Sequence, residues 1–292
     1  MASRYTSLKK ILEIAKSENR PLSELVLEWE AEDTEDSKGN IYNKMAECLL
    51  VMEQASIDGC DKDLCSTSGL TGGDAYRLKA FLENGNSLLG KTFSEMLINA
   101  IAVSELNASM GRIVAAPTAG SCGILPAAII TLLNNGKATR HKAIMSLFTA
   151  SAVGSVIANN ASLAGAEGGC QAECGSASAM AAAAIVEIMG GTPEMIDSAV
   201  SIALGNMLGL VCDPVAGLVE IPCIMRNASS VANAFAAAEC VLAGIKCHIP
   251  ADETIVAMKR IGDALPHSLK ETAEGGLAAT PAAREIYKKI FG

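Results

Sequence analysis

The sequence predicts an all-α protein whose helices are joined by Gly- and Pro-rich loops that form its site. Aromatic residues make up only 3% of the 292 residues. Ala, Leu, Met, Glu and Lys dominate wherever the chain is not Gly-rich, so strand-forming sequence is scarce. Half of the residues are hydrophobic, which is enough to bury a substantial core. We expect one helical domain over residues 1–292, opened by an N-terminal helical segment over residues 1–60.

The first segment alternates polar and apolar residues at helical spacing. Its acidic stretch, Glu30–Asp36, is typical of a solvated loop or a helix end. From about residue 95 to 245 charge becomes sparse and Ala, Ser and Gly become dense. This pattern is typical of helices that pack closely and are buried on most sides.

Local signals place several helices within and after this apolar half. Ser176–Met189 reads as a helix that Gly190 stops, and Thr192 with Pro193 predicts a helix that runs to about Leu208. Three more helices are expected: one from near Ile124, one over Ala228–Leu242, and one that Asp252 caps and that ends near Ala264.

Charge and hydropathy exclude two classes of partner. The formal net charge of -9 leaves no basic stripe for nucleic acid. The uncharged run Ile144–Ala158 is too short to span a membrane, and Asn159-Asn160 rather than a basic anchor follow it. The N-terminus shows no secretory signal, so we expect a cytoplasmic chain whose ten cysteines stay reduced.

Four Gly- and Pro-rich connectors interrupt the helices. A buried loop must satisfy its own backbone groups, so four of them in an apolar helical protein predict a site built from loops. Each one alone is equally typical of a tight turn between helices. The connectors are Ser66–Gly73, Ala116–Gly123, Ala164–Cys170 and Cys212–Gly217.

Three cysteines stand in such connectors or beside proline. Cys170 follows two glycines, Cys212 precedes Asp-Pro, and Cys223 follows Pro. These flanks free a thiolate from helix geometry and put backbone N–H donors near its sulfur, as metal ligation requires. The spacings of 42 and 11 residues match no compact ferredoxin or zinc pattern. Spacing alone therefore leaves open both a metal site and ordinary core cysteines.

Long motifs carry a more specific signal. Three of them, in this order along the chain, resemble the iron–sulfur-dependent L-serine dehydratase family, and two shorter ones extend the resemblance. The long motifs are NASMGRIVAAPTAGSCGILP (107–126), EGGCQAECGSASAMAAAA (167–184) and LGLVCDPVAGLVEIPCIMRN (208–227), and the short ones are SGLTGGD (68–74) and KETAEGGL (270–277).

The resemblance implies a helical catalytic domain whose cluster- and substrate-binding core covers residues 61–292. It implies a 4Fe–4S cluster on Cys170, Cys212 and Cys223, with a fourth iron left for L-serine, which would be converted to pyruvate and ammonia. Loss of hydroxide from serine needs a Lewis acid on the leaving oxygen, and an open iron supplies one. No Schiff-base lysine followed by a glycine-rich phosphate loop offers a pyridoxal-phosphate alternative.

Residues that would bind the substrate follow from the same motifs. Hydroxyls and backbone N–H groups ahead of a helix near Ile124 are suited to a carboxylate, and those of Ser66–Gly73 are suited equally. A structural turn is the competing interpretation of each loop. The substrate-binding candidates are Ser68, Thr71, Thr118, Gly120, Ser121 and Asn227.

The sequence alone identifies neither the catalytic base nor the complete set of cluster ligands. The three histidines stand in surface-like sequence, while Glu167 and Glu173 flank Cys170 as second-sphere, acid-base or helix-capping groups. We assign no catalytic base. Cys174, four residues after Cys170, is the strongest rival as a cluster ligand.

The chain departs from the single-chain members of the family in two ways. It leaves no room for a second domain, and it ends in Ile-Phe-Gly rather than in a cysteine. We therefore expect the α subunit of a two-chain enzyme, with a separate β subunit as partner and a homo-oligomer as a further option. Two other interpretations stay open, an iron–sulfur L-cysteine desulfidase and a helical scaffold without a cluster.

Overall fold

The structure is a computed structural model that describes residues 4–292. Within this range it contains thirteen α-helices, five shorter helical turns and no strand, which confirms the all-α prediction. The α-helices are α1 Leu8–Ser17, α2 Leu22–Asp33, α3 Lys38–Asp58, α4 Asp74–Glu83, α5 Gly90–Ala108, α6 Ile124–Asn134, α7 Arg140–Asn160, α8 Gly165–Gly168, α9 Ser176–Ile188, α10 Pro193–Gly205, α11 Cys223–Leu242, α12 Ala251–Ala264 and α13 Pro281–Phe291. The shorter turns are η1 Ala119–Ser121, η2 Gln171–Gly175, η3 Val215–Gly217, η4 His267–Leu269 and η5 Gly276–Ala279.

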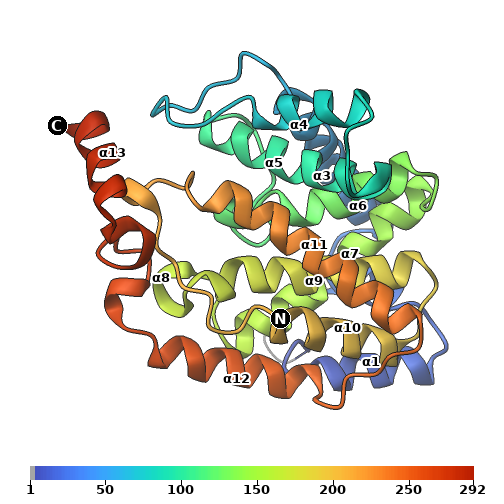
Figure 1. Ribbon diagram of the computed structural model, residues 1–292. Helices are drawn as coiled ribbons and strands as arrows, with labels where there is room; N and C mark the ends of the chain where they lie inside the picture. The colour runs from blue at the N-terminus through green and yellow to red at the C-terminus, as the bar shows by residue number, and fades with distance from the viewer. Residues whose placement is uncertain (1–3) are drawn as a thin grey trace.

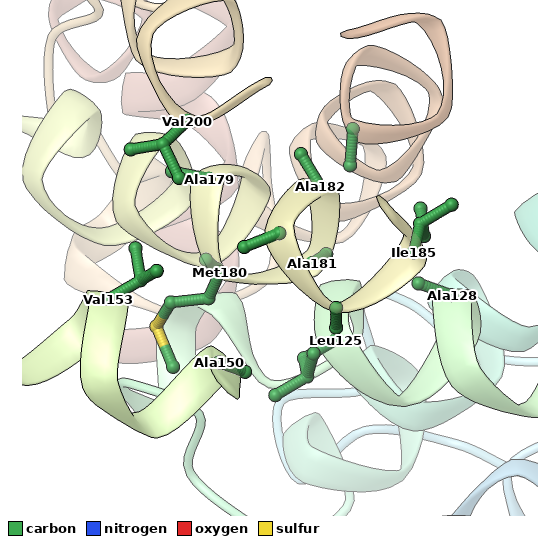
Figure 2. Packing of buried hydrophobic residues seen from close by; sticks show 14 of the residues in the cluster. Leu125, Ala128, Ala150, Val153, Ala179, Met180, Ala181, Ala182, Ile185 and Val200 are labelled. Atoms are coloured by element: carbon green, nitrogen blue, oxygen red, sulfur yellow. The ribbon is translucent and has the colours of Figure 1, made fainter. Parts of the chain in front are cut away.

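Helix α9 lies in the middle of the bundle and packs against α6, α7, α10 and α11 (Figure 1). Six of its thirteen residues are alanine, and those alanines are fully buried, so the neighbouring helices approach its backbone closely. Figure 2 shows Met180 of α9 beside Val153 of α7, with Leu125 of α6 beneath the same helix. The small side chains of α9 thus set the spacing of the whole core.

Helix α1 is joined to this core through α10 and α12, whereas α2 packs on α7 and α3 packs on α5, α6 and α7. Ser7 accepts from Lys10 N at the start of α1, and Asp252 of α12 supplies a second cap from far along the chain. Asp252 Oδ1 accepts from Leu8 N at 2.7 Å, and its Oδ2 accepts from Ser7 Oγ at 2.6 Å. The prediction that Asp252 caps its own helix is therefore wrong, because its carboxylate points to α1.

The apolar run Ile144–Ala158 forms most of α7, which is the one helix of the described chain long and apolar enough to cross a membrane by composition. Its most apolar window is 72% buried against other helices. Burial of this kind is typical of a core helix in a globular bundle. Asn159 and Asn160, at its end, donate to backbone carbonyls of Tyr5 and Thr6.

Several helix limits agree with the sequence signals and two do not. The α9 helix, the start of α6 and the Thr192 cap of α10 lie where we expected them, and α2 ends within the acidic stretch. Helix α10 ends at Gly205 rather than near Leu208. Helix α11 begins at Cys223, five residues before the expected Ala228, because Pro222 occupies its N-cap position and starts the helix directly.

One end of the molecule gathers the unusual loops. Helix α8 and the C-terminal segment that leads into α13 lie at the same edge of the bundle in Figure 1. Helix α12 contacts α8, and α13 contacts η3 and η5. Two of the connectors singled out in the sequence, Ala164–Cys170 and Cys212–Gly217, lie at this edge, because they contain α8 and η3.

Candidate metal centre

Cys170 is held at the entrance to α9 by a π-helical turn. It occupies the N-cap of η2, whose residues lead without interruption into α9. Gly169 precedes it with φ 75°, and a Cβ there would lie 2.9 Å from Leu210 O, so this position requires glycine. π-turns are rare and occur frequently at functional sites. Cys170 Sγ lies 3.3 Å from Cys174 Sγ, one turn further on.

The neighbouring Gln171 fixes this turn from the inside. It is 1% exposed, and its Nε2 donates to Gly168 O at 2.9 Å and Met258 O at 3.0 Å. Its Oε1 accepts from Gly209 N at 2.9 Å. One amide side chain thereby ties the turn of Cys170 both to α12 and to the loop before Cys212.

Cys212 lies in an extended segment that pairs with the C-terminal part of the chain. Its N donates to Leu269 O at 2.9 Å, and its carbonyl accepts from Glu271 N at 2.8 Å. The next residue, Asp213, is 3% exposed and accepts from Leu277 N at 2.7 Å. These bonds fix the segment of Cys212 against residues 269–277.

A buried ion pair joins that segment to α11. Arg226 Nη2 lies 2.8 Å from Asp213 Oδ1, although no N–H is aligned on that oxygen as a hydrogen bond. Arg226 Nη1 donates to Val211 O at 2.8 Å. Cys223 is the first residue of the same helix, one turn before Arg226, and follows the cis peptide Ile221–Pro222. The cation is thus held beside the segments that carry two of the three cysteines.

The three predicted ligands lie close enough to act on one another electrostatically. Burial raises the pKa of the Cys212 thiol above its ordinary range, and Cys170 and Cys223 add to the increase. Burial, followed by the charge of Cys170, raises the pKa of Cys223 to about 12, while Arg226 opposes this. The pKa of Cys170 is lowered, first by its hydrogen bond with Cys174 and also by Arg226. All three thiols are buried, and Gln171 and Arg226 join the segments that carry them.

Glu173 adds a carboxylate to this region. Its Oε1 accepts from Thr118 Oγ1 at 2.8 Å, and its Oε2 lies 4.0 Å from Cys212 Sγ. Burial raises its pKa, and the Thr118 hydroxyl partly opposes the shift. A Cβ on Gly165 would lie 2.7 Å from Oε2 and 2.9 Å from Cys212 Sγ, so this glycine leaves the space that the two groups occupy.

The loop with Thr118 closes the same region from the side of α6. Thr118 Oγ1 lies 3.1 Å from Ser121 Oγ, and Gly120 packs against the Glu173 carboxylate. Asn227 of α11 secures the loop, because its Nδ2 donates to Gly120 O at 2.8 Å and its Oδ1 accepts from Gly123 N at 2.9 Å. The amide of Asn227 is therefore engaged by backbone groups, and the side chain positions the loop.

The remaining two substrate candidates lie on the loop that precedes α4. Ser68 Oγ donates to Glu220 Oε1 at 2.7 Å, and Thr71 Oγ1 donates to Glu220 Oε2 at 2.6 Å. Glu220 stands three residues before Cys223 and is 4% exposed. The loop is thus attached to the segment that carries one of the cysteines.

Thiols are the donors that iron–sulfur clusters use, and three of them in a buried region beside a cation fit such a group. Within residues 4–292, no three His, Cys, Asp or Glu side chains are arranged to hold a single metal ion. A cluster is larger than one ion and separates its ligands more widely. The residues present therefore fit a polynuclear iron–sulfur group.

Comparison with known proteins decides the family. The family model described as "Serine dehydratase alpha chain" matches residues 17–278. The chain belongs to this family.

Curated relatives of the family cover almost the whole chain. It is 51% identical over 288 residues to the probable L-serine dehydratase, alpha chain, of Bacillus subtilis (strain 168), covering 99% of this chain and 96% of the relative. It is 41% identical over 283 residues to the L-serine dehydratase, alpha chain, of Peptoniphilus asaccharolyticus, covering 97% of each. The L-serine dehydratase of Mycobacterium bovis is 37% identical over 295 residues, covering 97% of this chain but 62% of that protein.

The structure also shows where the remaining residues discussed from the sequence lie, and it shows two residues that the sequence analysis did not single out. His141, His248 and His267 are all exposed, as expected. Cys174 is buried beside Cys170 and stays a rival ligand. Sequence reasoning missed Gln171 and Glu220, although a Gln directly after Cys170 and a Glu directly before Ile-Pro-Cys are both visible within the long motifs.

Proposed function

We propose that the chain is the α subunit of an iron–sulfur L-serine dehydratase, which converts L-serine to pyruvate and ammonia. The observation that supports this proposal is the burial of Cys170, Cys212 and Cys223 on segments that Gln171 and Arg226 join, with Glu173 linking them to the Thr118 loop. The names of the relatives agree with it, since each of those described above is called an L-serine dehydratase.

In this proposal the three thiolates hold a 4Fe–4S cluster. When bound, the cluster supplies one iron with an open coordination position, which acts as a Lewis acid on the substrate hydroxyl. Arg226 lies beside Cys170 and Cys223 and offsets the negative charge that three thiolates bring into a buried place.

The protein's own groups orient the substrate. Thr118, Gly120 and Ser121 line the turn ahead of α6, where backbone N–H groups are suited to a carboxylate. Glu173 holds the Thr118 hydroxyl at 2.8 Å and so fixes the direction of that group, and Asn227 fixes the backbone of the same turn. Removal of the α-proton and loss of water give aminoacrylate, whose imine tautomer hydrolyses to pyruvate and ammonia.

Partner and location complete the proposal. A separate β subunit docks on the chain. Relatives of matching length are named alpha chains, and the match to the M. bovis relative leaves more than a third of that protein's own length uncovered. A homo-oligomer of the resulting pair and a cytoplasmic location are further parts of this proposal.

The test is anaerobic purification of the chain with its β subunit, followed by measurement of iron, sulfide and pyruvate formation from L-serine. Replacement of each of Cys170, Cys212 and Cys223 by Ser is expected to lower the iron content. Cys65→Ser is the matched control, because that thiol is exposed. Cys174→Ser decides whether the rival cysteine is a ligand.

Three results would contradict the proposal in different ways. Serine turnover by a colourless, iron-free protein would exclude the cluster. Faster sulfide release from L-cysteine than pyruvate release from L-serine would favour the desulfidase. Unchanged iron content in all three ligand variants would favour the scaffold.

A further inference from the structure

Glu220 is a buried carboxylate without a cation. It is 4% exposed, and within residues 4–292 no Lys, Arg or His lies within ion-pair distance of it. Its two partners are the neutral hydroxyls of Ser68 and Thr71. Asp213, which is about as deeply buried, has the guanidinium of Arg226 as its counter-ion. Buried charges in proteins are normally paired, so the lone charge of Glu220 calls for a cation.

The two hydroxyls beside Glu220 are oriented as acceptors. Each one donates its single proton to a carboxylate oxygen, Ser68 at 2.7 Å and Thr71 at 2.6 Å. A hydroxyl has one proton and two lone pairs, so the remaining capacity of both oxygens is for accepting hydrogen bonds. Both are therefore unsuited to donate to a substrate carboxylate. Ser68 Oγ already accepts from Leu70 N and from Ser66 Oγ, which lies 3.2 Å away, so its lone pairs are occupied. Thr71 Oγ1 is the oxygen suited to accept from an ammonium group.

The loop holds these oxygens rigidly. Ser68 Oγ also accepts from Leu70 N at 3.1 Å, and Ser66 Oγ accepts from Thr71 N at 3.2 Å. At its end the loop leads into α4, where the buried Glu105 accepts from the first two backbone N–H groups of the helix. Thr71 Oγ1 accepts no hydrogen bond within the described chain, so it has lone pairs to offer.

We propose that Thr71 binds the α-ammonium group of the substrate amino acid, and that Glu220 is the positioning residue that directs the lone pairs of Thr71 and balances the positive charge. Ser68 holds the other oxygen of the Glu220 carboxylate in place. This assignment rests on the proposed function. It divides the recognition of an amino acid between two loops: the turn at Thr118 takes the carboxylate, and the loop at Thr71 takes the ammonium. The sequence had suggested a carboxylate site for both loops.

The test compares L-serine with L-glycerate, in which a hydroxyl replaces the ammonium group. Steady-state kinetics of the wild-type holoenzyme and of Glu220→Gln give KM for L-serine and the inhibition constant for L-glycerate. Because a charge-assisted contact is lost, Glu220→Gln is expected to raise KM for L-serine by roughly 10- to 100-fold. It leaves the inhibition constant for L-glycerate nearly unchanged, since that ligand brings no cation.

Equal weakening of both ligands would overturn the proposal, because it would show that Glu220 only shapes the loop. Unchanged KM would overturn it as well, as would inhibition of the wild-type enzyme by L-glycerate as strong as the binding of L-serine. Glu53→Gln is the matched control, since that carboxylate also accepts two bonds, from Arg140, but lies on α3 away from the loop. It is expected to leave both constants as in the wild type.

A second readout is independent of turnover. In the ligand-free chain the uncompensated charge of Glu220 costs stability, so Glu220→Gln should melt at the same temperature as the wild type or higher. A marked decrease would make Glu220 a structural residue and overturn the proposal. If the wild-type complex contains no iron and does not convert L-serine, the proposed function fails. The melting temperature of Glu220→Gln tests the uncompensated charge of Glu220 separately.

Discussion

The ion pair between Asp213 and Arg226 predicts a specific loss of stability. Asp213→Asn keeps the volume of the side chain and one oxygen that can accept from Leu277 N. It removes the negative charge that lies 2.8 Å from the Arg226 guanidinium. The side chains of both residues are buried, at 4% and 15% exposure, so the cation left behind has little access to water.

Breaking a buried pair by removing one partner costs about 3–5 kcal/mol of unfolding free energy. The lower limit applies here, because Arg226 keeps its bond of 2.8 Å to Val211 O. For a chain of 292 residues, a loss of about 3 kcal/mol lowers Tm by roughly 5 °C. Because Asp213 also accepts from Leu277 N, amide exchange should rise in the segment 266–280 before the core of the bundle opens.

The measurement is calorimetric or circular-dichroism melting of the apo chain, with hydrogen exchange read by mass spectrometry. Asp263→Asn is the control, since its ion pair with Lys259 is exposed. Its Tm should change by less than about 2 °C. A Tm of Asp213→Asn within error of that control would refute the reasoning, and unchanged exchange in 266–280 would remove Asp213 as the anchor of that segment.

Three further predictions concern carboxylate burial and close packing. Burial raises the pKa of Glu187 despite hydrogen bonds from Ser23 and Thr149, so the folded state binds more protons and wild-type stability falls as pH rises above the ordinary glutamate range. Glu187→Gln should reduce this slope in urea unfolding at several pH values; an identical slope would contradict it. Gly165→Ala places a Cβ 2.9 Å from Cys212 Sγ and should lower the iron content after anaerobic reconstitution. An iron content equal to that of the wild type would show that the surrounding side chains can move to accept the methyl group. Gly59→Ala should destabilise by about 1–3 kcal/mol, because its Cβ would meet a backbone oxygen at 1.9 Å. Gly205→Ala meets open space and should stabilise by about 0.4–1 kcal/mol; urea midpoints in the reverse order would contradict this pair.

The sequence predicts most of the helices because their signals are local. Thr192 caps α10 through its own side chain, and the alanines of α9 favour a helix whatever surrounds them. The start of α11 was missed because Pro222, which reads as a connector, stands directly at its N-cap position. Asp252 was misassigned because the backbone N–H groups that it binds are more than two hundred residues away.

The sequence marks the cysteines proposed as ligands, but it does not mark the residues that support them. Glycine and proline flanks mark Cys170 and Cys212 in the sequence itself. Glu220 and Gln171 carry no such mark, since their roles depend on hydroxyls and carbonyls that only the fold brings to them. Directions of hydroxyl protons are likewise invisible in a sequence, and they decide whether Ser68 and Thr71 accept or donate.

The π-helical turn Gln171–Gly175 sets the direction of Cys170 relative to α9. An α-helix turns by about 100° per residue, so deleting one residue from this turn would rotate Cys170 and Glu173 around the axis of α9 by that angle. The alanine faces that pack against α7 and α10 would keep their places. The extra residue of the π-helical turn therefore sets the angle at which Cys170 and Glu173 project from the end of α9, without a change in how α9 packs in the bundle.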